Sequence, residues 1–158
     1  MRSLSSRSSL FLLAAALLLA MAACDSTTVY HHYEHVEAPG WEHHDTVFFA
    51  IPPSRLSAVL HEEVELRTTS EYPYRDLCLV VHQTTFPSLR QRTDTLRCSM
   101  ADEFGNIKGR GIGVYQYHFH LTDLSLSEGD SVVLAIRHNM RTETLRGITD
   151  IGVRLSKK

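Results

Sequence analysis

The sequence predicts an all-β chain, an antiparallel β-sandwich of about seven or eight strands that follows a cleaved signal peptide. Short apolar runs rich in valine, isoleucine and aromatic residues alternate with turn residues, and no long amphipathic helix or crossover helix is evident. The 158 residues include 43% hydrophobic and 22% charged residues. This composition is typical of a globular protein and excludes a disordered or collagen-like chain.

The first 23 residues have the features of a bacterial lipoprotein signal. Two arginines precede the apolar segment 10–20 (LFLLAAALLLA), which is shorter than the roughly 20 residues that span a bilayer. Small residues precede Cys24, as in the bacterial lipobox, where the cysteine is acylated. We therefore expect cleavage between Ala23 and Cys24 and a lipid anchor on Cys24, in which each buried methylene contributes about 0.8 kcal/mol. An ordinary secretory signal with an incidental cysteine is the alternative.

The expected organisation is a signal peptide over residues 1–23, an acylated N-terminus and short tether over residues 24–28, and one domain over residues 29–158. The net charge of −2 is not accompanied by a cluster of lysines and arginines. A surface that follows nucleic-acid phosphates is therefore excluded, and the expected contact with a membrane is through the acyl anchor.

Three strands are expected in the first part of the domain. A polar strand begins at Val29, and the apolar run 46–51 (TVFFAI) ends at two prolines, which cannot donate to a ladder. Residues 60–67 alternate apolar with polar side chains except at Glu62, which is typical of a strand with one buried and one wet face. A helix beginning near Ser54 would also align the apolar residues here, so the start of this element stays open.

Five further strands are expected over residues 76–84, 93–100, 113–121, 131–138 and 148–155. Turn residues that supply a fixed or positive φ separate them, among them a proline–serine pair and a Glu-Gly-Asp sequence. The alternation and the frequent breaks favour an antiparallel sandwich over any α/β arrangement.

Cys78 and Cys98 are expected outside the cytoplasm, where a disulfide can persist. If their strands form a hairpin that closes near Ser88, the two cysteines face each other, although only some cross-strand geometries allow a bond. A disulfide and two buried free thiols both remain open.

The ten histidines make a metal site the first chemistry to consider. On a strand, His31, Tyr33 and His35 share one face while His32 and Glu34 share the other, so the potential ligands do not converge. No histidine or cysteine spacing matches a known zinc module. We therefore expect a solvated polar strand and no metal.

A second histidine pair, His118 and His120, shares one face of its strand with Gln116, and aromatic residues face the other side. Two histidines at this spacing can supply half a metal site, but the same alternation is typical of a strand with an apolar inner and a polar outer face. We favour the second interpretation.

Catalytic and cofactor motifs are missing from the sequence. The glycines of residues 105–113 (GNIKGRGIG) precede a strand instead of the helix that a nucleotide fingerprint requires, so a bent strand or bulge is expected. No G-x-S-x-G, S-x-x-K or H-E-x-x-H motif occurs. We expect no cofactor, no catalytic residues and no enzymatic activity.

Several motifs, taken in order, resemble the gliding motility lipoprotein family GldH. They are YPYRDL at residues 72–77, DTL at residues 94–96, the glycine series of residues 105–113, MR at residues 140–141 and LRGITDIG at residues 145–152. The resemblance spans essentially the whole mature chain.

The resemblance implies an accessory lipoprotein, anchored in the outer membrane and facing the periplasm. Such a protein supports the gliding machinery and the associated type IX secretion system by holding other proteins of these complexes in place, without turning over a substrate. The alternative from another class is a lipid-anchored, glycan-binding sandwich. That function requires an exposed aromatic platform, built from Trp41 and tyrosines.

Loop ends are the candidate interaction surface, because aromatic and arginine side chains are enriched at interfaces. Tyr72 and Tyr74 flank a proline, and Met140 and Arg141 follow a strand. A purely structural role is the alternative: a tyrosine ring packed on the sandwich edge with its hydroxyl bonded to backbone, and Arg141 paired with an acidic neighbour.

Overall fold

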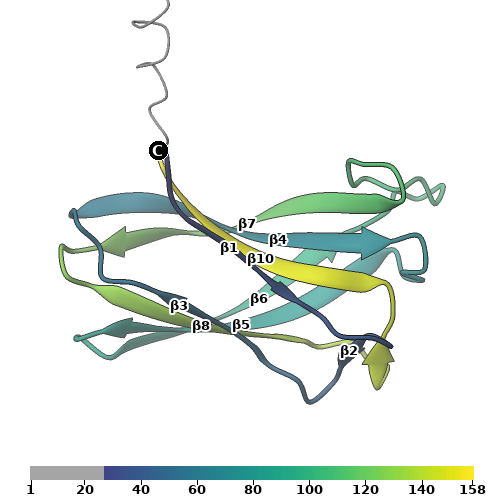
Figure 1. Ribbon diagram of the computed structural model, residues 1–158, viewed down its shortest axis with the longest axis horizontal. Coiled ribbons are helices and arrows are strands. Elements are labelled where there is room, and N and C mark those ends of the chain that lie inside the picture. The colour runs from purple at the N-terminus through teal and green to yellow at the C-terminus, as the bar shows by residue number, and fades with distance from the viewer. Residues whose placement is uncertain (1–26) are drawn as a thin grey trace, which may run out of the picture.

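The computed structural model describes residues 27–158, so the signal peptide, the cleavage position at Ala23 and the anchor Cys24 lie outside the described residues. The described part is built from strands that form two four-stranded sheets and one two-stranded ribbon (Figure 1). The strands are β1 (Thr28–His35), β2 (Trp41–Glu42), β3 (Val47–Ile51), β4 (Ala58–Thr69), β5 (Asp76–Phe86), β6 (Arg90–Ser99), β7 (Val114–Leu126), β8 (Ser131–His138), β9 (Thr144–Leu145) and β10 (Ile148–Lys157). Within residues 27–158 there is no helix long and apolar enough to cross a bilayer.

The two sheets pack face to face as a sandwich (Figure 1). The first sheet has the strand order β1-β10-β4-β7 and the second has the order β3-β8-β5-β6. Every pairing in them is antiparallel. The fold class predicted from the sequence is therefore confirmed.

The observed strands match the expected ones closely where apolar alternation is regular. β8 covers the expected residues 131–138, and β4 is a strand from Ala58, so the helix near Ser54 is wrong. The expected strand ends at Leu121, but β7 continues for five more residues. A bulge in the ladder with β4 at this point interrupts the alternation on which the expected end was based. β2 and β9 were not expected, since two residues are too short to show a pattern.

The core lies between the sheets and consists of apolar side chains that alternate along the strands. On β8, Val132, Leu134 and Ile136 are buried and their neighbours are partly exposed. Each such side chain contributes about 2 kcal/mol by leaving water. The β2–β9 ribbon closes one end of this core, and Trp41 of the ribbon is 1% exposed, with its Nε1–H donating to the Asp45 carbonyl at 3.1 Å.

The hairpin pairing predicted for the cysteines is wrong by one residue. Cys78 pairs with Arg97, and Cys98 pairs with Leu77. Because a shift of one residue changes the face of every side chain, Cys98 lies in the core and Cys78 on the outer face of the second sheet. Both thiols are free, and only Cys98 is buried, so the alternative of two buried free thiols holds for Cys98 but not for Cys78.

The chain enters the sandwich at one end and carries long loops at the other. Thr28 pairs with Ser156 near the N-terminal end of β4, and the opposite end of β4 leads into the loop of residues 70–75 (Figure 1). The loops of residues 70–75, 100–113 and 139–147 gather at this opposite end, which we call the distal end. The described domain therefore presents its longest loops away from the side where the N-terminal segment joins it.

Candidate functional site

The predicted interaction residues all lie at the distal end. The Tyr72 hydroxyl donates to the Asp76 carbonyl at 2.9 Å, and the ring packs edge-on against Tyr74, with centroids 5.9 Å apart. Burial raises the pKa of Tyr72 above its ordinary value. Tyr72 thus has the structural contacts of the alternative stated for it, whereas Tyr74 is exposed.

Met140 and Arg141 follow β8 and lie at the same end of the domain, next to the start of β5. The Met140 sulfur accepts the Cys78 backbone N–H at 3.5 Å, and the side chain packs partly against the core. Arg141 is exposed and forms no ion pair with any described residue, so the alternative in which it pairs with an acidic neighbour is not met. Of these two side chains, Arg141 is the one free to contact another protein.

Two family motifs meet at the distal end because of one glycine. Gly147 has a φ of 80° and lies so close to the backbone of Tyr72 that a Cβ would overlap the Tyr72 nitrogen. The Thr69 N–H also donates to the Gly147 carbonyl at 2.8 Å. The YPY segment and the LRGITDIG segment are therefore held together by direct backbone packing.

The distal end also exposes apolar side chains, and of these the sequence analysis singled out only Tyr74. Five of the ten exposed large hydrophobic side chains of residues 27–158 lie there: Tyr74, Phe104, Ile107, Ile112 and Val114. Phe104 is 83% exposed and Ile112 is fully exposed. The sequence signal that could have identified these side chains is the apolar residues within and beside the glycine series of residues 105–113. That segment was assessed only as a possible phosphate-binding loop. Exposed apolar side chains that lie together are typical of interaction sites.

A glycan platform built on Trp41 is contradicted by the structure. Trp41 is buried under the β2–β9 ribbon, where its ring packs edge-on against His138 at 5.3 Å. Tyr72 and Tyr74 are tilted by 73° and form no common plane. The aromatic surface that the glycan-binding alternative required is absent from residues 27–158.

The outer face of the first sheet holds a second group of polar side chains. His31 and Tyr33 of β1 share one face, as predicted, and this face points outward together with Gln116, His118 and His120 of β7. The strand register places both groups on the same face, with β10 and β4 between them. We call this surface the His–Glu face; its members are His31, Tyr33, His61, Glu63, Glu65, Gln116, His118, His120 and Asp123.

Glu65 is the centre of this face and is wholly buried although it points away from the core. Its Oε2 accepts hydrogen bonds from the Tyr33 hydroxyl and from His31 Nε2, the latter at 3.0 Å. The Gln116 amide donates to the Tyr33 oxygen at 2.8 Å. Burial by itself raises the pKa of Glu65, but these hydrogen bonds and the charge of His118 hold it below its ordinary value.

Gly152 explains how Tyr33 reaches across β10 to cover Glu65. Tyr33 pairs with Gly152, and a Cβ at Gly152 would lie 2.7 Å from the tyrosine ring. The Arg67 guanidinium lies over the other side of the ring, 3.9 Å from its centroid. Burial and the bond to Glu65 raise the pKa of Tyr33, so its hydroxyl remains a donor.

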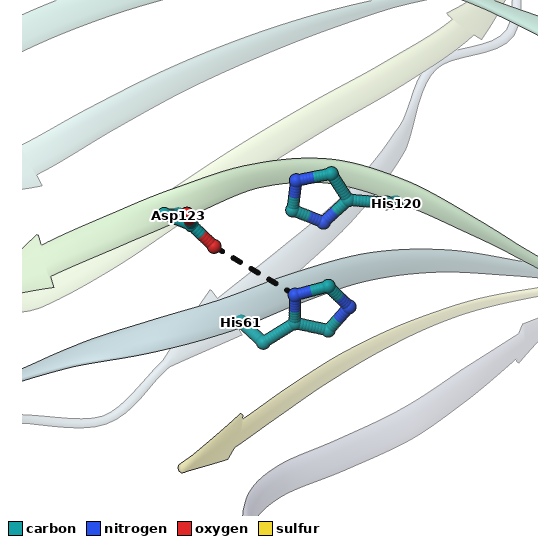
Figure 2. A group of neighbouring side chains, drawn as sticks. All are labelled: His61, His120 and Asp123. Carbon is teal, nitrogen blue, oxygen red and sulfur yellow. Dashed lines mark ion pairs between the residues drawn. The ribbon is translucent and has the colours of Figure 1, made fainter. Parts of the chain in front are cut away.

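Two groups of side chains on the His–Glu face could hold a metal ion. One comprises Glu63, Glu65 and His118, and the other His61, His120 and Asp123. Within each group the possible ligand atoms lie within 4.8 Å of one another. Figure 2 shows the second group, with His61 and Asp123 facing each other across β4 and β7 at 3.7 Å.

The comparisons with known proteins agree with the motifs. The GldH lipoprotein family matches residues 28–155. The gliding motility lipoprotein GldH of Flavobacterium johnsoniae is 30% identical over 125 residues, which cover 75% of this chain and 78% of that protein.

Two solved structures show weaker likeness. The Eiger TNF structure from S. frugiperda is 13% identical and covers 81% of this chain and 92% of its own, with a TM-score of 0.35. An aminopeptidase from a marine sediment Thaumarchaeota archaeon is 15% identical and covers 72% of this chain and 24% of its own, with a TM-score of 0.37. These scores carry no argument about function. The match of the family along nearly all described strands, together with the Flavobacterium relative, shows that the chain belongs to the GldH lipoprotein family.

Proposed function

We propose that this protein is a lipid-anchored, non-enzymatic accessory component of the gliding motility machinery and of the associated type IX secretion system. It acts in the assembly or stability of the complex by contacting other proteins of the machinery. The observation that carries the proposal is membership in the GldH lipoprotein family, whose Flavobacterium member is named for gliding motility.

The shape of the domain supports different roles for its two ends, membrane anchoring at one and contact with partner proteins at the other. The N-terminal segment, which holds the expected anchor Cys24, joins the domain at Thr28. The distal end lies at the other end of the first sheet and carries Tyr74, Arg141, Phe104 and exposed isoleucines. Anchored in the outer membrane by acyl chains on Cys24, the domain would face the periplasm and present the distal end to its partners.

The chemistry of the distal end suits a protein partner. Exposed phenylalanine, tyrosine and isoleucine side chains supply apolar area, and arginine supplies donors in a fixed geometry. Beside them lies a cleft of about 260 Å³, whose lining includes Tyr72, Tyr74, Met100 and Ile107. A partner side chain of moderate size fits such a cleft and would add to the apolar contact.

The test is complementation of a deletion strain with distal-end variants, scored by spreading on agar and by type IX cargo in the medium. The double variant Phe104→Ser and Ile112→Ser is expected to lose both functions while the protein accumulates normally. Phe48→Ser is the matched control, because Phe48 is 62% exposed on β3, outside the distal end. Full complementation by the double variant would refute contact through these side chains.

A further inference from the structure

Three potential ligands converge on the His–Glu face from two neighbouring strands. Glu63 and Glu65 are two residues apart on β4 and share its outer side, and His118 pairs with Glu65 across the ladder to β7. The carboxylate oxygens and the imidazole nitrogen of this group lie within 4.8 Å of one another. Neither strand alone shows the group, because each contributes only a part of it.

One ligand atom of the group is buried and unsatisfied. The Glu65 side chain is 1% exposed, and its Oε1 accepts no hydrogen bond from any described residue. His118 Nδ1 lies 3.1 Å from Oε1, which is an ion pair when the imidazole is protonated but is outside hydrogen-bonding geometry. A buried carboxylate oxygen without a hydrogen-bond donor is costly, so this position favours a cation at Oε1, either the protonated His118 or a bound metal ion.

The spacing of these two atoms fits a shared cation. Ligands of a tetrahedral zinc ion at bond lengths of about 2.0–2.2 Å lie about 3.3–3.6 Å apart. The distance of 3.1 Å between Glu65 Oε1 and His118 Nδ1 is slightly shorter than this range. Two electron-pair donors at this distance repel each other unless a proton or a metal ion lies between them.

The surroundings of Glu65 hold its free oxygen toward the group. Tyr33 and His31 bind the other oxygen, Oε2, and Gln116 fixes Tyr33. Outer hydrogen bonds of this kind orient carboxylate ligands in metal sites.

The neighbouring group of His61, His120 and Asp123 is less suited to an ion. Asp123 already accepts the Lys158 ammonium at 2.6 Å. The two imidazole rings are stacked 4.3 Å apart and only 8° from parallel, so their nitrogen lone pairs run side by side (Figure 2). His61 Nε2 nevertheless lies 3.6 Å from Glu63 Oε1, so this group borders the first one.

We propose that Glu63, Glu65 and His118 form a binding site for a divalent transition-metal ion of the zinc type, with one coordination position open to water or to a partner's side chain. Imidazole and carboxylate together are the donor set that such ions accept. His118 is partly exposed, so an ion can enter from solvent. The site lies on the outer face of the first sheet, on β4 and β7.

The test is calorimetric titration of the full-length lipoprotein in detergent with ZnCl₂, after purification without a histidine tag and removal of metals. We expect saturable binding of one ion per chain. His118→Gln should weaken the affinity by at least about tenfold, and Glu63→Gln should weaken it as well. His82→Gln is the matched control, because His82 is an exposed histidine on the second sheet, and it should leave the affinity unchanged.

Circular dichroism of each variant confirms that the sheets are intact, and the partly exposed Glu63 provides a variant that spares the buried Glu65. Absence of saturable zinc binding to the wild-type chain would overturn the proposal. So would wild-type affinity in both the His118→Gln and Glu63→Gln variants. Loss of binding in His120→Gln with normal binding in His118→Gln would place the ion in the neighbouring group and refute the assignment.

Discussion

Replacement of Glu62 by glutamine tests the electrostatics of the sandwich interior. Glu62 is the one charged side chain of β4 that points between the sheets; it is wholly buried, and neither carboxylate oxygen has a hydrogen-bond donor within the described strands. Burial raises its pKa to about 7 from an ordinary value of 4.5, against the opposing attraction of Arg92 and with a smaller contribution from Asp94.

The magnitude follows from the pKa difference between the folded and unfolded chains. The folded state holds the proton more tightly, so the free energy of unfolding falls as the pH rises from 4.5 to about 7 and changes little above that. At 1.36 kcal/mol per pKa unit, the ionised form costs on the order of 3 kcal/mol. Glutamine has a similar volume and does not ionise, so Glu62→Gln should remove this cost.

The assay is urea unfolding of a soluble domain that lacks the signal and Cys24, measured from about pH 4.5 to about pH 8. The stability of Glu62→Gln relative to wild type should rise by on the order of 3 kcal/mol across this range. Any fixed cost of the buried amide cancels in this difference. Glu103→Gln, at an exposed loop position, is the control with the same change of charge. A pH-independent difference between Glu62→Gln and wild type would refute the reasoning.

Two further predictions concern the His–Glu face and the cysteines. Gly152→Ala should destabilise the domain by about 1–3 kcal/mol, because the new methyl group displaces Tyr33 from Glu65; denaturant unfolding measures it, and unchanged stability would contradict the packing. Cys98 should resist a thiol-reactive disulfide reagent in the native domain and react on unfolding, because burial raises the pKa of its thiol. A disulfide to Cys78 would contradict this, and mass spectrometry would show it as the loss of about two hydrogens, about 2 Da.

The sequence predicts the sandwich well because apolar alternation reports burial directly. β8 shows this most clearly, since each second residue is buried along its whole length. The shared face of His31 and Tyr33 and the outward direction of His118 and His120 were also predicted correctly from alternation. Where a bulge shifts the register, as at Leu121, the same reasoning ends a strand too early.

The His–Glu face could not be predicted because it depends on which strands are neighbours. Glu65 was assigned to a wet face, and it is buried only because Tyr33, 32 positions earlier in the chain, crosses Gly152 to cover it. The strand that holds His118 was interpreted by itself, so Glu63 on the neighbouring strand was not considered as a second ligand. The cysteine pairing failed for a related reason: hairpin register depends on the turn, and a difference of one residue exchanges the two faces.

The most direct test of the proposed role is a clean deletion in the source organism, complemented either by the intact gene or by Cys24→Ala. Spreading on agar and type IX cargo in the medium are scored, with membrane fractionation to show where each protein resides. We predict that deletion abolishes both functions, that the intact gene restores them and that Cys24→Ala, although folded and exported, does not. Normal spreading and secretion in the deletion strain, or full rescue by Cys24→Ala, would contradict an anchored accessory role.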